Sequence, residues 1–376
     1  MKIAVLSSHT PSLFWFRMDM MQDFIRLGHT VIAVGNEEAE KWKDKFKGKN
    51  IKYIQADISR NGTNPLSDIK TLFSLKKILR QEAPDKIFTY QAKTVIYGSL
   101  AAASIGIKEI YPLIAGCGSV FLSKGAKAML LQKVMSTEYR IALKKSKKVF
   151  FQNSDDVKLF KDLKMVEPQK TVMLNGSGVN LDKFTPLPFP HDFAFLCISR
   201  LIRDKGVLEY MQAAELVKKK YPQVRFLLVG PYDSNPSALK KEEVEGYIDK
   251  GIIEYFGEQA NVIPYLEQCN VFVLPSYREG TPKTVLEAMA SQRAVITTDA
   301  PGCRETVKNG ANGFLVPVKD VGALASKMIY LINNPDVAEK MGSEGRKTAE
   351  EKFDVKIVNK KIIEVMDLRS FSYEFV

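Results

Sequence analysis

Residues 271–299 read VFVLPSYREGTPKTVLEAMASQRAVITTD, and this stretch decides the fold. An apolar, β-branched run (VFVLPS) is followed by a polar turn, a helix-forming segment (VLEAMASQ) and a second β-branched run (AVITTD). A strand, a helix and a strand in this order build a parallel sheet, and its strands are apolar throughout because helices cover both faces. The stretch therefore predicts an α/β protein.

The same alternation extends over the whole chain of 376 residues, a length that suits two domains. Strand-like runs occur in the first half at 3–7, 31–34, 53–56, 87–90, 110–114, 149–153 and 172–176. After a proline-rich segment (185–193) they resume at 193–199, 226–230, 252–256, 271–276, 294–299 and 314–318. We expect two doubly wound parallel-sheet domains, residues 1–185 and 186–376, with the ligand site in a cleft at the carboxyl ends of their strands.

Composition excludes several classes of protein. Hydrophobic residues make up 45% and charged residues 26%, as in ordinary globular proteins. The four cysteines are scattered, which indicates reduced thiols in a cytoplasmic protein. The apolar run in MKIAVLSSHTPS is too short for a signal peptide, and no ~20-residue apolar stretch could span a bilayer.

Motifs for cofactors and metals are also missing from the sequence. The first strand is followed by SSHTPSLFWFR without a G-x-G-x-x-G fingerprint, and there is no Walker phosphate loop. The chain has three histidines and no metal-ligand spacing. We therefore expect no bound cofactor and no required metal.

The positive charge is concentrated in the first half. Residues 1–185 carry 30 Lys and Arg against 17 Asp and Glu, a net +13, whereas residues 186–376 carry 25 against 26, a net −1. A basic half predicts an anionic partner, such as nucleic acid, phospholipid or a polyprenyl phosphate. No nucleic-acid recognition motif accompanies the charge, so nucleic acid is not expected as a partner.

The turn YREGT in the opening stretch has the features of a phosphate site. Pro282 suits the first position of a helix and Thr281 its N-cap. The backbone N–H groups of Gly280 and Thr281 would then lie at a positive helix terminus. Glu279 precedes the helix and Glu287 lies within it, so the two carboxylates would bracket a ligand and bind its hydroxyl groups. Two ordinary surface glutamates are the alternative that this spacing leaves open.

A second basic turn follows the strand at 193–199. In CISRLIRDKGVLEY, Arg200 and Lys205 flank the turn into the next helix, at the sheet edge that the glutamate turn also occupies. Two cations there would hold a diphosphate and stabilise its charge as a leaving group, and a solvated basic turn is the alternative.

Taken together, these segments resemble glycosyltransferase family 4. SRLIRDKG, LVGPYD, FGEQANVIPYLEQCNVFVLPS, REGTPKTVLEAMA and APGCRETVKNGANGFLV occur in the order found in the family's second domain, and NGSGVNLDKFTP (175–186) is also typical. The resemblance implies the GT-B fold, two Rossmann-like domains facing a central cleft, with retention at the anomeric carbon and no metal. It also implies that the last ~20 residues pack back on the first domain.

The resemblance implies a role for each matching residue. Arg200 and Lys205 would contact the donor diphosphate, Glu279 the donor sugar and Glu287 the ribose. The set implied for the donor is Arg200, Lys205, Glu258 (near the nucleobase), Glu279, Gly280, Thr281, Pro282 and Glu287, of which Arg200, Lys205 and Glu279 are the catalytic candidates.

The first domain resembles the branch of the family that extends polyprenyl-diphosphate glycans, in particular bacterial transferases that add N-acetylgalactosamine to undecaprenyl-diphosphate-linked bacillosamine. The segments that carry this resemblance are SHTPSLFWFRM (8–18) and IAGCGSVF (114–121) in the first domain, together with LVGPYDSNPS (228–237) in the second. Ala115 stands where many family members have a histidine near the donor sugar, so no catalytic histidine is assigned.

Acceptor contacts are expected from two loops of the first domain. Gly116 and Gly118 would allow the backbone to approach the diphosphate or the acceptor, or they form a tight turn only. His9 and Arg17 follow the first strand, and Arg17 would pair with an acceptor phosphate. In the alternative, Trp15 and Phe16 pack under the loop and Arg17 pairs with a carboxylate.

Residues 122–148 predict a basic amphipathic helix. They include eight Lys or Arg and one Glu, with apolar residues at roughly helical spacing. Such a helix can lie on an anionic membrane, which would place the enzyme peripherally on the inner face of the cytoplasmic membrane. An ordinary helix with one core face and one solvated basic face is the alternative.

The resemblance therefore implies a retaining transfer of a sugar, a HexNAc, from a UDP-sugar to a polyprenyl-diphosphate-linked saccharide in bacterial glycan assembly (glycoprotein, capsule or O-antigen). Two other functions stay open, a UDP-sugar epimerase of the same fold and a non-catalytic nucleotide-sugar-binding module.

Overall fold

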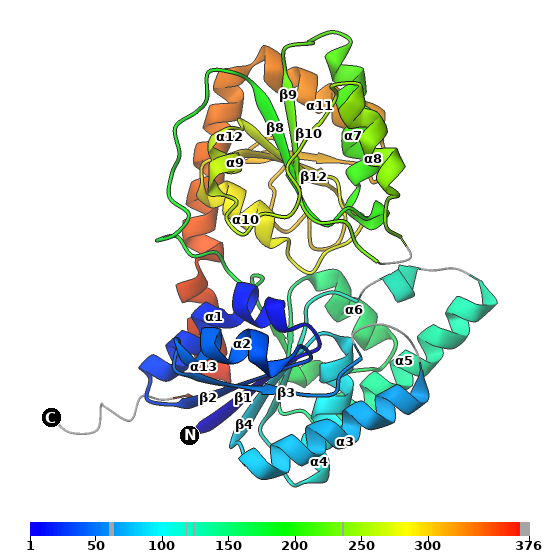
Figure 1. The fold of residues 1–376 in the computed structure, drawn as a ribbon, viewed down its shortest axis with the longest axis vertical. Helices are drawn as coiled ribbons and strands as arrows, with labels where there is room; N and C mark the ends of the chain where they lie inside the picture. The colour runs from blue at the N-terminus through cyan, green and yellow to red at the C-terminus, as the bar shows by residue number, and fades with distance from the viewer. Residues whose placement is uncertain (60–63, 118, 123–124, 235–236, 369–376) are drawn as a thin grey trace, which may run out of the picture. The chain divides into compact units, whose positions relative to one another are not determined.

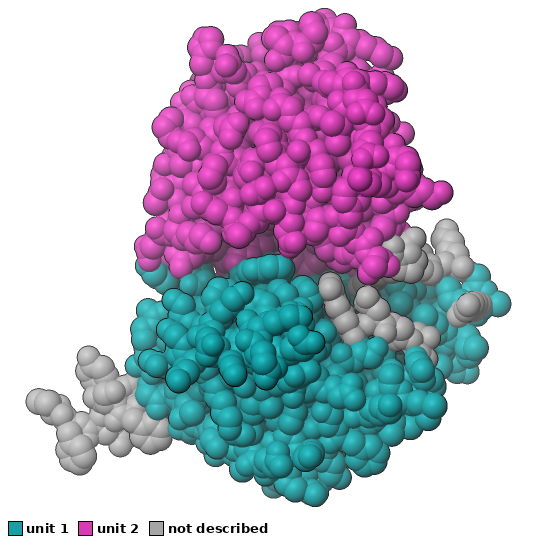
Figure 2. Space-filling view, viewed as in Figure 1, with its two compact units in different colours: residues 1–177, 355–376 teal, residues 178–354 magenta. Residues whose placement is uncertain are grey.

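The computed structural model describes residues 1–59, 64–117, 119–122, 125–234 and 237–368. They form two compact units, residues 1–177 with 355–376 and residues 178–354 (Figures 1 and 2). The chain thus passes into the second unit at residue 178, earlier than the predicted boundary at 185. The segment before the proline-rich stretch belongs to the second unit because Val179 and Phe184 are buried in its core beside Phe353.

Unit 1 is built on a parallel sheet in the order β3-β2-β1-β4-β5-β6-β7. Its strands are β1 (Lys2–Ser7), β2 (Thr30–Gly35), β3 (Ile51–Gln55), β4 (Lys86–Tyr90), β5 (Ile110–Ile114), β6 (Val149–Phe151) and β7 (Thr171–Met173). Its α-helices are α1 (Thr10–Arg26), α2 (Ala39–Lys47), α3 (Pro65–Glu82), α4 (Ser99–Ser104), α5 (Ala126–Lys144), α6 (Ser154–Asp162) and α13 (Val355–Val365), with a π-helical turn, η1 (Thr94–Gly98), before α4.

Two apolar cores cover the two faces of this sheet. One contains the inward residues of α3, α4 and α5, and the other those of α1 and α13. Helix α13 belongs to this unit because Val358, Ile362 and Met366 are buried against the core that also contains Phe24 of α1. The described part of the C-terminal segment therefore packs on the first unit, as expected.

Unit 2 is built on a parallel sheet in the order β10-β9-β8-β11-β12-β13. Its strands are β8 (Ala194–Ile198), β9 (Arg225–Val229), β10 (Glu254–Tyr255), β11 (Val271–Leu274), β12 (Ala294–Thr298) and β13 (Gly313–Val316). Its α-helices are α7 (Val207–Lys218), α8 (Lys241–Asp249), α9 (Ile263–Glu267), α10 (Lys283–Ala290), α11 (Val321–Asn333) and α12 (Pro335–Thr348).

The strand predictions are confirmed in both units. The segments expected from apolar runs all contain strands, and the registers of the pairs are parallel. In each sheet the chain runs outward on one side of the first strand and then returns to its other side, at β1/β4 and at β8/β11. These two reversals are where a doubly wound sheet opens a crevice for a ligand.

Candidate active site

The reversal in unit 2 brings two loops together at the carboxyl ends of adjacent strands. Residues 199–206 follow β8 and residues 275–282 follow β11, and Val271 and Phe272 pair with Phe195 and Leu196. One loop carries the basic turn and the other the glutamate turn. The sheet topology therefore places both predicted donor segments at one crevice of unit 2.

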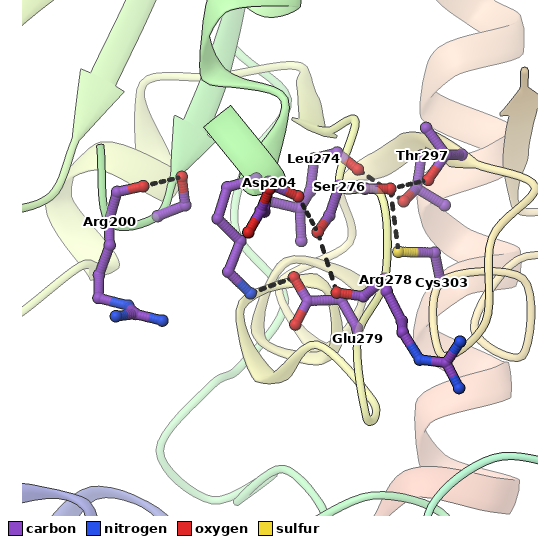
Figure 3. Close-up of polar contacts among 11 residues, drawn as sticks. Arg200, Asp204, Leu274, Ser276, Arg278, Glu279, Thr297 and Cys303 are labelled. Atoms are coloured by element: carbon purple, nitrogen blue, oxygen red, sulfur yellow. Dashed lines mark hydrogen bonds and ion pairs between the residues drawn. The ribbon is translucent and has the colours of Figure 1, made fainter. Parts of the chain in front are cut away.

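An ion pair joins these two loops. The Lys205 Nζ donates to Glu279 Oε1 between a side chain that is 21% exposed and one that is 12% exposed (Figure 3). Backbone contacts support the pair, because the Asp204 carbonyl accepts from Tyr277 N at 2.9 Å and from Ser276 Oγ at 3.1 Å. The cation and the carboxylate are thus positioned by the backbone of both loops.

Two glycines allow this close approach. At Gly206, with φ +69°, a Cβ would lie 2.1 Å from the Pro275 carbonyl oxygen, and at Gly302, with φ +82°, it would lie 2.3 Å from that of Glu279. The Glu279 N–H also donates to the Pro301 carbonyl at 2.8 Å. A side chain at either glycine would push the loops apart. The sequence interpretation did not use these glycines, although D-K-G before a helix and A-P-G after a strand are turn signals.

The helix that carries Glu287 begins one residue later than predicted. Pro282, with φ −72° and ψ 111°, is the N-cap of α10, and no side-chain hydrogen bond caps the helix. The predicted Thr281 cap is therefore wrong, because the extended ψ of Pro282 delays the first helical turn to Lys283. Gly280 and Thr281 still lie just before the Pro282 N-cap, at the end of α10 where a helix dipole favours an anion.

Glu287 is largely buried, which disfavours its charge. Burial raises the pKa of its carboxyl above the ordinary value, and the nearby cations Lys283 and Lys183 oppose that rise. The Lys283 Nζ is 4.0 Å from Glu287 Oε1. The sequence interpretation missed both lysines. The i,i+4 spacing on α10 was the available signal for Lys283, whereas Lys183 approaches only through the fold.

Arg200 and Glu258 lie apart from the Lys205–Glu279 pair. The Arg200 guanidinium donates to Asp233 Oδ2 at 2.8 Å, and Figure 3 draws Arg200 to one side of the loop that carries Glu279. Glu258 is exposed and follows the edge strand β10, which β9 separates from β8. The structure thus brings Lys205 and Glu279 together and leaves Arg200 engaged with an acid that the sequence interpretation did not identify.

In unit 1, the reversal between β1 and β4 carries a network of small polar side chains. The hydroxyls of Ser7 and Ser8 both donate to Gln91 Oε1 at 2.9 Å, and Gln91 Nε2 donates to Ser12 Oγ at 3.1 Å. Gln91 has φ +72°, a conformation that few non-glycine residues adopt. His9, at the N-cap of α1, lies beside this network and its ring approaches Trp15 edge-on at 6.1 Å.

The expectation for Arg17 and its neighbours needs correction. Arg17 is 2% exposed, and its guanidinium lies over the rings of Tyr90 and Phe88, 4.9 and 5.7 Å from their centroids. Burial lowers its pKa to about 10. Trp15 and Phe16 are exposed instead of packed under the loop. The helical period explains why Arg17 is buried and the two aromatic residues are exposed. Arg17 lies on the face that α1 turns to the sheet, and the two aromatic residues do not.

The glycine loop after β5 is described in part. Gly116 has φ +117°, which suits glycine and fits the predicted turn. Gly118 lies outside the described residues.

Two further observations concern metals and membranes. Within the described residues there is no group of three or more His, Cys, Asp or Glu side chains placed to hold a metal ion. No helix in that same part of the chain has the length and hydropathy needed to cross a bilayer.

Comparison with known proteins gives matches along both units. The family model described as "Glycosyl transferase 4-like" matches residues 2–153, and "Glycosyl transferases group 1" matches residues 192–334. Among curated proteins, N,N'-diacetylbacillosaminyl-diphospho-undecaprenol alpha-1,3-N-acetylgalactosaminyltransferase of Campylobacter jejuni is 28% identical over 98% of both chains. UDP-Gal:alpha-D-GlcNAc-diphosphoundecaprenol alpha-1,3-galactosyltransferase of Escherichia coli is 25% identical over 72% of each.

The fold has close structural neighbours. Sucrose-phosphate synthase from Thermosynechococcus elongatus superposes with a TM-score of 0.81 at 18% identity and covers 98% of each chain. Since the two family models together match residues 2–153 and 192–334, which include strands β1–β6 and β8–β13, and the fold is GT-B, the chain belongs to the glycosyltransferases of family 4.

Proposed function

We propose that this glycosyltransferase transfers a HexNAc from a UDP-sugar to a polyprenyl-diphosphate-linked saccharide, with retention at the anomeric carbon and without a metal. The observation that carries the proposal is the Lys205–Glu279 ion pair, which lies at the reversal of the unit 2 sheet and whose Glu279 belongs to the loop that leads into α10. Such a site offers a cation and a helix terminus to phosphates, and a carboxylate to sugar hydroxyls.

Each of these groups has a distinct task in the transfer. The Lys205 ammonium and the backbone at Gly280 and Thr281 stabilise the negative charge that develops on the departing diphosphate. Glu279 accepts hydrogen bonds from the donor sugar, and Glu287 accepts them from the ribose. The bond between the anomeric carbon and UDP breaks while the acceptor oxygen bonds on the same face, and the leaving phosphate takes the acceptor's proton.

Arg200 joins the site by exchanging partners. Its guanidinium is bound to the Asp233 carboxylate, which carries one negative charge. A donor diphosphate carries two negative charges and can take the place of that carboxylate. A planar guanidinium can bind such oxygens in a bidentate manner, which Lys cannot do. We assign Arg200 to the diphosphate and Asp233 to holding the guanidinium before the donor binds.

The names of two relatives support the proposed acceptor and place of action. The names of the two bacterial relatives specify undecaprenyl-diphosphate acceptors, and one specifies a UDP-sugar donor. A lipid-linked acceptor requires contact with a membrane, and the net positive charge of the first half suits the anionic inner face of the cytoplasmic membrane.

The test is a transfer assay with UDP-GalNAc, UDP-GlcNAc, UDP-Gal and UDP-Glc against polyprenyl-diphosphate-linked mono- and disaccharides. We expect one UDP-HexNAc to react, an α-linked product by NMR, and an unchanged rate in EDTA. A parallel reaction without acceptor detects isomerisation. Rapid isomerisation there, a β-linked product, or loss of activity in EDTA would each contradict part of the proposal.

A further inference from the structure

Helix α3 of unit 1 presents large hydrophobic side chains to solvent. Leu66, Ile69 and Phe73 are 71%, 49% and 64% exposed, at positions i, i+3 and i+7 that share one face of the helix. The opposite face packs into the core through Leu75, Ile78 and Leu79. Scattered exposed leucines need no explanation, but three large apolar side chains in one stripe mark an interaction surface.

Cations share this outward face with the apolar stripe. Lys70, Lys77 and Arg80 are exposed on it. The acidic residues of α3 are paired with lysines outside this helix. Asp68 is buried and paired with Lys93, and Glu82 pairs with Lys52. The outward face of α3 is therefore apolar and positive.

Helix α5 lies on the same face of the sheet as α3, with η1 packed against both helices, and repeats the pattern. The Tyr97 hydroxyl lies 3.0 Å from Asp68 Oδ2 of α3 and 2.8 Å from Glu138 Oε1 of α5, so its one proton can be donated to either carboxylate. Both helices bury their inner faces in one core, and Figure 1 shows where they lie in unit 1. Two helices on the same face of a sheet turn their outer faces to the same side. The exposed residues of α5 include an apolar set and a basic set: Leu130, Val134 and Ile141, and Lys133, Arg140 and Lys144.

A basic groove lies at the C-terminal end of α5. It has a volume of about 420 Å³, and Arg140, Lys144, Lys161 and Lys164 line it. Glu167 is the acidic residue among those that line the groove, and it pairs with Lys170 at 3.1 Å. The groove continues the positive surface of α5 and is large enough for a phosphate headgroup.

We propose that the outward faces of α3 and α5 form a docking surface for an anionic bilayer, with Leu66, Ile69 and Phe73 inserted at the interface. Interspersed cations and large apolar side chains fit lipid headgroups and acyl chains together. A second copy of the chain fits less well, because a twofold contact through this face would set Lys70, Lys77 and Arg80 against the same cations of the partner. The inference rests on the proposed lipid-linked acceptor and names the surface that would reach it.

The first experiment measures sedimentation of the full chain with phosphatidylcholine vesicles, with and without phosphatidylglycerol. We expect binding that requires phosphatidylglycerol. The triple variant Leu66→Ser, Ile69→Ser, Phe73→Ser should bind about tenfold or more weakly, since each side chain loses apolar burial. The triple variant Lys70→Ser, Lys77→Ser, Arg80→Ser should bind roughly a hundredfold more weakly.

A matched control removes apolar side chains elsewhere. Leu216, Tyr330 and Ile357 are 44%, 44% and 43% exposed, so the variant Leu216→Ser, Tyr330→Ser, Ile357→Ser changes a comparable exposed set and should bind vesicles like the wild type. The variant Phe73→Trp gives a direct reading, because its added indole fluorescence should be quenched by brominated lipid while that of Leu216→Trp should not. Unchanged vesicle binding by the α3 variants, or no quenching of the fluorescence added by Phe73→Trp, would overturn the proposal.

Two further readouts separate this inference from the proposed function. A water-soluble, short-chain acceptor should be glycosylated at the same rate by the wild type and the α3 variants, whereas the full-length lipid acceptor in vesicles should be used less by the variants. Vesicle binding without any transferase activity would remove the proposed function and keep the docking surface. A dimer in solution that the α3 substitutions abolish, with no vesicle binding, would assign the face to a second copy and overturn the inference.

Discussion

Lys205 and Glu279 are 74 positions apart in the chain, yet their side chains form an ion pair between the loops that follow β8 and β11. The pair joins a cation suited to a diphosphate to a carboxylate suited to a sugar before any ligand is bound. The ion pair therefore holds the Lys205 ammonium and the Glu279 carboxylate in place. The donor has to replace this ion pair with its own contacts when it binds.

We predict that Lys205→Ala lowers kcat by about 10²–10³, because it removes a cation that stabilises the departing diphosphate. The chain should still fold, as judged by circular dichroism. Lys219→Ala, an exposed lysine just after α7, is the control and should leave the rate unchanged. Near-normal turnover of Lys205→Ala would remove this residue from the mechanism.

The ion pair should also appear as coupling between its two partners. Because each substitution removes the same contact, the losses of stability from Lys205→Ala and Glu279→Ala should sum to more than the loss in the double variant. Urea unfolding of the four proteins measures this difference. Simple additivity would mean that the contact contributes nothing to the free energy of unfolding.

Glu287→Gln should make the donor-free protein more stable and the enzyme worse. Burial raises the pKa of this carboxyl, so ionisation costs the folded state stability as the pH rises from the unfolded pKa through the folded one. The stability gain of Glu287→Gln over wild type should thus be absent in acid and grow toward neutral pH. Melting temperatures across pH measure it.

The same substitution should weaken UDP-sugar binding by about 10–100-fold, because a neutral amide replaces a charged acceptor of ribose hydrogen bonds. Isothermal titration calorimetry gives the affinity. Unchanged donor affinity would remove Glu287 from the ribose site, whatever its effect on stability.

Gly206→Ala tests the close approach of the two loops. Gly206 and Gly251 have nearly the same φ, +69° and +66°, but of the two only Gly206 has an atom that a Cβ would meet within 4 Å. We expect Gly251→Ala to cost about 1–2 kcal/mol from backbone conformation alone. Gly206→Ala should cost about 1–3 kcal/mol more and lower kcat/KM, because Lys205 moves with the loop. Equal effects of the two substitutions on stability and activity would show that the loops can separate freely.

The burial of the cysteine thiols predicts that they react slowly with thiol reagents in the native protein. None of the four cysteines forms a disulfide and all four are buried, and burial raises the pKa of Cys197, Cys269 and Cys303 to about 12. At about pH 8 the native protein should react with Ellman's reagent far more slowly than the urea-denatured chain, which should show all four thiols. Rapid reaction of a thiol in the native protein would contradict this burial.

Much of the fold could be predicted from local sequence. Runs such as VFVLPS and IYPLI are apolar on both sides of the strand, and only a parallel sheet covered by helices on both faces accommodates them. The turn YREGT and the helix-forming segment VLEAMASQ likewise predicted Glu279 in a loop and Glu287 in the helix that follows, because a strand–turn–helix is specified over a few residues.

The partners of those residues could not be predicted in the same way. Lys205 meets Glu279 because β8 lies beside β11, although β9 and β10 come between them in the chain. Arg200 meets Asp233, and Lys183 approaches Glu287, through contacts between segments that are remote in sequence. Such pairings depend on strand order and loop conformation, which no short window of residues contains.

The exposure of helix residues likewise depended partly on the sequence and partly on the tertiary structure. The sequence by itself determined the period of each helix and the residues that share a face. Only the tertiary structure decided which face is covered, so that Arg17 is buried over Tyr90 while Leu66, Ile69 and Phe73 are exposed. The physical reason is that periodicity fixes angles around a helix axis, whereas burial depends on what the rest of the chain places against it.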